Sequence, residues 1–295
     1  MKISLEDDGT FLPSQVLHEV TDKVVASLSA ITTSEKQFVV NDSLYFRESR
    51  RGKITPCVVN SAAFLSSAFQ ANLANLKGAE GETAIGKQSI DGLITTTFRG
   101  AGFKIADKDN LLQVIHGYIE ENKLPSKSIY TLFPKFYGMF VDRGFYQIDH
   151  IPERFHGLFE TTSNQGKFRI GVEFETGNIA SSFRAINKLF VLFQDGQIDA
   201  GVFVTSTDKR SSATRIWPVS NRNGSFQELT ERDYQNQVSL PLVCIGFAPD
   251  KFCENALFLG QSGNLFKLKD SGKLHASGRH RILLGEANEE ILSEV

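Results

Sequence analysis

The sequence predicts a mixed-sheet α/β fold with an α+β tendency, built from a β-hairpin, a crossover helix and a parallel strand and flanked by helices. Residues 168–175 and 199–205 are dense in β-branched and aromatic side chains, which is typical of strands. Between them, residues 179–194 repeat apolar side chains at steps of three and four, which is the period of a helix. A strand, a helix and a second strand in this order fit a parallel βαβ unit.

A hairpin is predicted immediately before this unit. Residues 154–162 and 167–175 flank the run Ser163-Asn164-Gln165-Gly166, whose composition is typical of a tight turn. We therefore expect these two segments to pair as antiparallel strands.

The first 125 residues are predicted to be mainly helical. Apolar side chains recur at helical spacing in four stripes, which begin at Val16, Phe64, Ile90 and Leu111. We expect a mainly helical region over residues 1–130 and a sheet core with a C-terminal extension over residues 131–295, packed as one compact domain.

Composition describes an ordinary soluble globular chain of 295 residues, 41 % hydrophobic and 22 % charged. The three cysteines have no metal-type spacing, and their odd number argues against a disulfide framework. Asp7 and Asp8 stand where a signal peptide requires an apolar run, and no apolar run approaches the length of a membrane span. We expect a cytoplasmic protein.

Positive charge is clustered although the formal net charge is only −2. Residues 47–53 and 208–222 each sum to +3, and residues 267–281 sum to +4. One such cluster is usually a solvated face, but three in a near-neutral chain favour a polyanionic partner.

Acidic residues supply the candidate chemistry. Glu173 and Glu175 are two positions apart on a predicted strand and therefore point to the same face. The predicted hairpin would bring Asp149 toward them, and converging carboxylates are the ligands that Mg²⁺ prefers. A solvated strand face is the alternative interpretation of this Glu-x-Glu pattern.

Residues 145–220 resemble the PD-(D/E)XK nucleases. The likeness rests on the acid-x-acid run in GVEFETGNIASSFRAINKLF and on the following strand IDAGVFVTST. Because glutamate stands at the usual lysine position, the sequence resembles the branch of type II restriction endonucleases related to BamHI and BglII. The resemblance implies a restriction-endonuclease-like core and a prokaryotic source.

The same resemblance implies the roles of the acidic residues. Asp149 and Glu173 would hold one or two Mg²⁺ ions, with no other cofactor, and Asp149, Glu173 and Glu175 would be catalytic. Glu175, at the lysine position, would act as general base or as a ligand of a second ion. Glu153 and Glu160 compete with Asp149 for the role of the first acid, since no Pro-Asp dipeptide precedes Glu173.

DNA contacts are expected from polar residues that follow the second strand. Arginine and lysine suit phosphate contacts, and arginine and asparagine suit base edges. The candidates are Lys209, Arg210, Arg215, Asn221, Arg222 and Asn223. Arg184 and Lys188 share one face of the predicted helix and are candidates to support the acidic site or a partner protomer.

These observations favour a Mg²⁺-dependent type II restriction endonuclease that cuts double-stranded DNA at a short palindromic sequence as a homodimer. A DNA-binding or regulatory protein on the same fold, without cleavage, is the alternative. A third possibility is an interaction protein whose two glutamates are only surface residues. No motif for nucleotide binding or for a serine nucleophile is present.

Overall fold

A six-stranded mixed sheet forms the centre of the computed structural model, which describes residues 1–7, 12–143, 148, 151–176, 179–207, 226–231 and 237–295. The strand order is β1-β11-β10-β9-β8-β5. β9 (Glu160–Glu175), β10 (Ala200–Ser206) and β11 (Leu242–Ala248) run parallel to one another. β1 (Lys2–Asp7), β8 (Gly92–Lys104) and β5 (Ala79–Glu80) each pair with their neighbour antiparallel.

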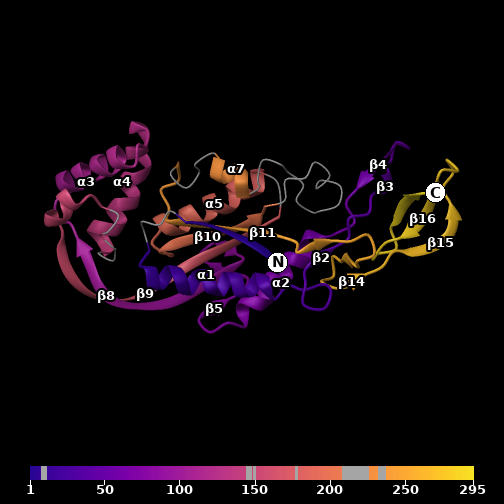
Figure 1. Cartoon of the computed structure of the whole chain (residues 1–295), viewed down its shortest axis with the longest axis horizontal. Helices are drawn as coiled ribbons and strands as arrows, with labels where there is room; N and C mark the ends of the chain where they lie inside the picture. The colour runs from indigo at the N-terminus through magenta and orange to yellow at the C-terminus, as the bar shows by residue number, and fades with distance from the viewer. Residues whose placement is uncertain (8–11, 144–147, 149–150, 177–178, 208–225, 232–236) are drawn as a thin grey trace.

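Helices cover both faces of this sheet (Figure 1). On one face, α1 (Ser14–Ser29) and α2 (Ala62–Ala74) pack on Ile170, Val172 and Phe174 of β9. On the other face, α5 (Ile179–Gln194) and α7 (Phe226–Glu231) pack on Phe203 and Cys244. The alternation of side chains along β9 therefore turns Glu173 and Glu175 toward the α5 face.

Local sequence explains where several helices begin and end. The Ser61 hydroxyl accepts a hydrogen bond from Ala63 N and caps α2, and Asp107 caps α3 (Lys108–Glu121) in the same way. Beyond α5, Gly196 has a positive φ of 66°, a conformation that glycine adopts without steric penalty.

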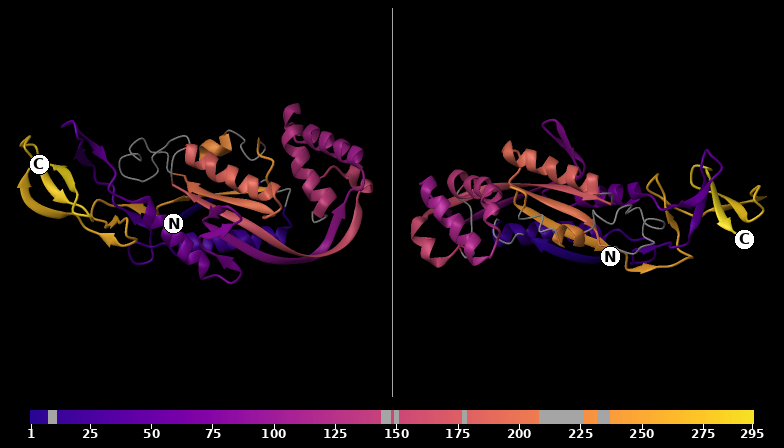
Figure 2. Two further views of the ribbon diagram at one scale, coloured as in Figure 1. Left: turned by 180° about the vertical axis from the view of Figure 1, so that it is seen from behind. Right: turned by 90° about the horizontal axis from the view of Figure 1, so that it is seen from above.

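The two longest strands, β8 and β9, extend beyond the sheet as a curved hairpin (Figures 1 and 2). Its far end carries α3, α4 (Ile129–Tyr137), the π-helical turn Gly138–Arg143 and the short 3₁₀ helices Ser126–Ser128 and Glu153–Leu158. We call the described residues of 105–159 the distal module. Its core, which includes Val114, Leu132, Phe136 and Phe140, is a hydrophobic cluster separate from those of the central sheet.

A second sheet lies at the opposite end of the elongated molecule (Figure 1). Its strand order is β15-β16-β17-β3-β4, with every pairing antiparallel. The strands are β15 (Lys269–Leu274), β16 (His280–Leu284), β17 (Glu290–Glu294), β3 (Tyr45–Glu48) and β4 (Ile54–Cys57).

The described residues also form three two-stranded ladders. The pairs are β2 (Val39–Val40) with β12 (Lys251–Phe252), β13 (Phe258–Leu259) with β14 (Leu265–Phe266), and β6 (Thr83–Ile85) with β7 (Gln88–Ile90). No helix in the described ranges is long and apolar enough to cross a membrane.

The strand–helix–strand unit predicted over residues 168–205 is confirmed as β9, α5 and β10, and the predicted mixed sheet flanked by helices is confirmed with it. The hairpin predicted over residues 154–175 is wrong, because residues 160–175 form one continuous strand. The partner of that strand is β8, and the distal module connects the two.

The helix predicted around Ile90, Ile94 and Phe98 is also wrong, since residues 92–104 form β8. A spacing of four residues places these side chains on one face of a helix. Because four is an even number, the same spacing also places them on one face of a strand. The boundary drawn at residue 130 falls inside α4, and β8 before it pairs with β9 after it.

Candidate active site

Glu173 and Glu175 lie side by side near the carboxyl end of β9. Glu173 pairs in register with Phe203 of β10, and Glu175 pairs with Thr205. The Glu173 side chain is only 2 % exposed, whereas Glu175 is partly buried. Ligands of open α/β sheets bind at the carboxyl ends of parallel strands, so both glutamates occupy a position suited to chemistry.

Asp91 is the third acid of this cluster. It directly precedes β8, whose Gly92 pairs with Val172, so Asp91 lies beside Glu173 in the antiparallel ladder. Asp91 Oδ2 accepts a hydrogen bond from Phe174 N at 2.9 Å, and Asp91 Oδ1 accepts one from Gln70 Nε2 at 2.7 Å. Two hydrogen bonds, from β9 and from α2, therefore fix the carboxylate against its neighbours.

Gly92 allows this close approach of α2 and β8. A Cβ atom at residue 92 would lie 2.3 Å from Leu73 Cδ2, well inside van der Waals contact. The Asp-Gly dipeptide thus lets β8 pack tightly under the helix that carries Gln70.

The pKa values of both glutamates are raised in this cluster. Burial raises the pKa of Glu173 to about 8, and the nearby charges of Asp91 and Glu175 contribute in the same direction, while Lys188 opposes the shift. Burial and then Asp91 also raise the pKa of Glu175, against the opposing fields of Lys188 and Arg184. A site of this kind favours either a proton or a bound cation.

Lys188 reaches this cluster from α5. Its Nζ lies 2.6 Å from Glu173 Oε1 and donates a hydrogen bond to the carbonyl oxygen of Ser89 at 2.7 Å. Glu173 Oε1 is buried and accepts no well-aligned hydrogen bond from the described residues, so this ion pair is its main compensation. Arg184, one turn earlier, is exposed, and its Nη2 donates to Ser181 Oγ at 3.3 Å.

The donor set has the chemistry that a hard divalent cation requires, because every candidate ligand is a carboxylate oxygen. Within the described ranges, however, no three His, Cys, Asp or Glu side chains are close enough to form a finished metal site. Mg²⁺ usually completes its coordination with waters and substrate phosphate, so two or three protein carboxylates suffice. Two carboxylates of this cluster therefore suffice for such an ion, and Asp91 and Glu173 are the candidates.

The predicted site residues fall into three groups. Glu173 and Glu175 lie together as expected, with Lys188 beside them. Glu160 begins β9 opposite Lys104, and Glu153 lies in a 3₁₀ helix of the distal module, so neither converges with Glu173. Asp149 and the six candidate DNA-contacting residues (Lys209, Arg210, Arg215, Asn221, Arg222 and Asn223) lie outside the described residues.

The sequence-based assignment omits Asp91 and Gln70. The run Leu93-Ile94-Thr95-Thr96-Thr97 is rich in β-branched residues and could have identified β8 as a strand. An acid at the start of that strand would then have been a candidate to face Glu173.

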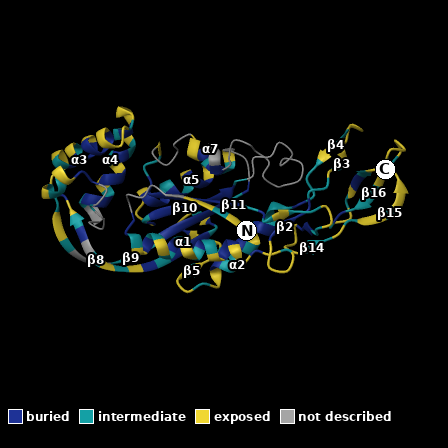
Figure 3. Cartoon of the chain, in the orientation of Figure 1, coloured by how far each residue is buried: buried dark blue, intermediate teal, exposed yellow. Residues whose placement is uncertain are grey.

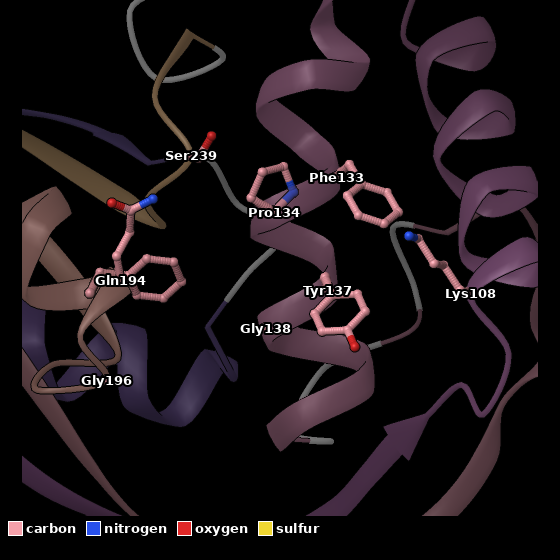
Figure 4. Close-up of a pocket in the computed structure, with 9 residues that line it drawn as sticks. Lys108, Phe133, Pro134, Tyr137, Gly138, Gln194, Gly196 and Ser239 are labelled. Carbon is pink, nitrogen blue, oxygen red and sulfur yellow. The ribbon is translucent and has the colours of Figure 1, made fainter.

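A pocket of about 580 Å³ lies away from these carboxylates, between the distal module and the central sheet (Figure 4). Phe133 and Tyr137 of α4 line one side, and Phe193 and Gln194 at the carboxyl end of α5 line the other. None of the three site acids contributes to it.

A mixed sheet with clustered acids beside a crossover helix defines the restriction-endonuclease-like class. Residues 1–264 match the family described as restriction endonuclease BamHI. The chain belongs to the BamHI restriction endonuclease family.

One curated relative is the type II restriction enzyme BamHI of Bacillus amyloliquefaciens. The two are 30 % identical over 96 residues, which is 32 % of this chain and 42 % of the relative. The matched stretch thus spans less than half of the length of that relative.

Proposed function

We propose that this protein is a Mg²⁺-dependent type II restriction endonuclease that hydrolyses phosphodiester bonds of double-stranded DNA at a short palindromic sequence. The observation that carries the proposal is the juxtaposition of Asp91, Glu173 and Glu175 at the end of β9, with raised pKa values for both glutamates. Membership of the BamHI family supports a DNA substrate and a nuclease reaction.

Asp91 and Glu173 are the residues that would hold a Mg²⁺ ion. When bound, the ion would acidify a water and stabilise the charge that develops on the phosphodiester. Gln70 orients Asp91 through its hydrogen bond, as residues behind a metal ligand commonly do.

Glu175 is the candidate general base or the ligand of a second ion. Burial raises the pKa of Glu175, which makes its carboxylate a stronger base. Lys188 contributes positive charge to the same group of carboxylates, although glutamate occupies the position where related nucleases usually carry lysine.

The remaining expectations are part of this proposal. A palindromic site cut in both strands requires two active sites, hence a homodimer with two-fold symmetry. Residues 1–130 would contribute to target recognition or dimer contacts, and we retain the expected cytoplasmic, prokaryotic setting. The basic and amide residues predicted to contact DNA come after β10, whose carboxyl end lies beside Glu175.

Digestion of a mixed-sequence plasmid tests the proposal. We expect discrete fragments with about millimolar Mg²⁺, and none with EDTA or with Glu173→Ala. Cutting retained by Glu173→Ala would contradict the assigned site. Salt-sensitive DNA binding without cutting would instead support a DNA-binding protein on the same fold.

A further inference from the structure

Two basic segments that are far apart in the sequence meet in the five-stranded sheet at the end of the molecule. Residues 47–53 include the end of β3 and its turn to β4, and residues 267–281 include β15 and its turn to β16. His275 Nε2 lies 3.3 Å from Glu48 Oε2, and the rings of Phe46 and His280 are 5.7 Å apart. We call the sheet β15-β16-β17-β3-β4 the basic sheet.

The cations of the basic sheet are exposed (Figure 3). Nine cations against two carboxylates leave the two segments with a formal charge of +7. Within the described part of the chain, none of the nine forms an ion pair. They are Arg47, Arg50, Arg51, Lys53, Lys267, Lys269, Lys273, Arg279 and Arg281.

Nearby acids neutralise this charge only in part. The four glutamates of the last ten residues lower the formal charge to +3. Glu286 accepts hydrogen bonds from Gln261 N and Ser262 N in the turn between β13 and β14, and Glu289 accepts one from Ala287 N. Asp270 accepts a hydrogen bond from Gly272 N within its own strand.

The turns that carry these cations are short hairpin turns closed by backbone hydrogen bonds. In the first turn, Ser49 N donates to the Lys53 carbonyl at 2.9 Å, and Gly52 adopts a positive φ of 73°. In the second, His275 N donates to the His280 carbonyl at 2.9 Å, and Gly278 adopts a positive φ of 68°. Less ordering entropy is therefore lost when these cations bind a partner.

The basic sheet extends from the edge of the central sheet that carries the site. Because β9, β10 and β11 are parallel, their carboxyl ends lie at one edge, and Glu173 and Glu175 are at the end of β9. The chain leaves β11 at this edge and continues through β12 to β14 into the basic sheet (Figures 1 and 2). A duplex placed at the carboxylates can therefore continue toward these cations.

Three of the five strands lie beyond the part of the chain that matches the BamHI family. The match ends at residue 264, before β15, β16 and β17 begin. The basic sheet thus depends largely on sequence that the family does not account for.

We propose that the basic sheet binds the phosphate backbone of duplex DNA outside the segment that is cut, a role that rests on the proposed nuclease function. Exposed arginine and lysine side chains suit phosphate contacts, which position a protein on DNA without reading its sequence. Each contact releases counterions, so the sheet contributes affinity that falls steeply with salt.

Paired charge reversals test this role. One variant carries Arg50→Glu and Arg51→Glu in the first turn, and another carries Lys273→Glu and Arg279→Glu at the second. The control, Lys36→Glu with Lys77→Glu, makes the same charge change at exposed residues in the links that follow α1 and α2. All three variants are made in the full chain, and circular dichroism checks that each is folded.

Fluorescence anisotropy measures binding in EDTA, which prevents cleavage, across a salt series. On a duplex of about 40 base pairs, we expect each basic-sheet pair to bind roughly tenfold more weakly and to lose about one to two units of salt slope. On a duplex of about 12 base pairs, too short to reach the basic sheet, we expect both pairs to bind like the wild type. The control should bind both duplexes like the wild type.

Equal binding of the 40-base-pair duplex (about four helical turns) by the wild type and both basic-sheet pairs would overturn the proposal. A second result would also overturn the proposal: the charge-reversal pairs lose binding to anionic phospholipid vesicles, while their binding to the duplex is unchanged. If the wild type cuts plasmid while the pairs bind DNA normally, only the role of the basic sheet fails. A wild type that neither binds nor cuts DNA would overturn the proposed nuclease function as well.

Discussion

Lys188 Nζ lies 2.6 Å from Glu173 Oε1, so a side chain from α5 supplies positive charge to a buried carboxylate at the end of β9. The same ammonium donates to the Ser89 carbonyl, which anchors it between α5 and β7. Lys188 therefore opposes the repulsion among Asp91, Glu173 and Glu175. In the proposed mechanism this positive charge lowers the pH at which Glu173 and Glu175 become ionised.

Lys188→Met is expected to raise the pKa of Glu173 further, because Lys188 favours the ionised carboxylate. The pH at which cleavage reaches half of its maximal rate should then move upward by about one unit. Lys188→Arg should keep most of the wild-type profile, since it retains the charge. An unchanged pH profile for Lys188→Met would contradict this role for the ion pair.

The stability of the metal-free protein is expected to fall as pH rises through the range between the unfolded and folded pKa values of Glu173. The folded pKa of about 8 lies above the ordinary value of 4.5, so the protonated form is favoured by folding. The stabilisation is complete below about pH 4.5 and is lost as pH approaches 8, at a rate of up to about 1.4 kcal/mol per pH unit.

Thermal unfolding across this pH range, with and without Mg²⁺, measures the effect. Glu173→Gln should flatten the dependence, because glutamine does not titrate in this range, and bound Mg²⁺ should stabilise the protein more at high pH than at low pH. Lys188→Met is not a suitable control here, because it changes the same titration. A slope that Glu173→Gln leaves intact would assign the pH dependence to other groups.

The identity of the first metal-binding acid can be decided by comparing Asp91→Asn with Asp149→Asn. Asp91 lies beside Glu173 and is held by Gln70 and Phe174 N, so its loss should lower the cleavage rate by on the order of 10³-fold. DNA binding in EDTA should persist in both variants. Gln70→Ala should lower the apparent Mg²⁺ affinity by about 10- to 100-fold, as expected for a residue that orients a ligand. A large loss in Asp149→Asn and none in Asp91→Asn would reverse the assignment.

The local sequence predicts the second half of β9, α5 and β10, because β-branched and aromatic residues are dense in the two strands and apolar side chains recur at steps of three and four in the helix. It also identified Glu173 and Glu175 as neighbours on one strand face, and it noted Lys188 on the helix. These features depend on residues that are close together in the chain.

The partner of β9 could not be predicted in the same way. The pairing of Gly92 with Val172 joins residues separated by the whole distal module, and no local pattern encodes that register. The turn-like run 163–166 therefore seemed to end a strand that in fact continues. The apolar spacing predicts a helix where β8 lies. The sequence therefore gives no reason to place Asp91 beside Glu173.

The distal module provides a further prediction, because its hydrophobic cluster is separate from those around the central sheet. Phe136 is fully buried there and packs against Tyr118 and Phe140, with ring centroids 5.4 and 5.5 Å away. Phe136→Ala should lower the local free energy of unfolding of the module by about 3 to 5 kcal/mol. Hydrogen exchange should then accelerate in α3 and α4 and stay slow in β9, β10 and β11.

Tyr130→Ala, at a side chain that is 81 % exposed, is the matched control and should leave both regions unchanged. Faster exchange throughout the central sheet in Phe136→Ala would show that the module and the sheet unfold as one cooperative unit.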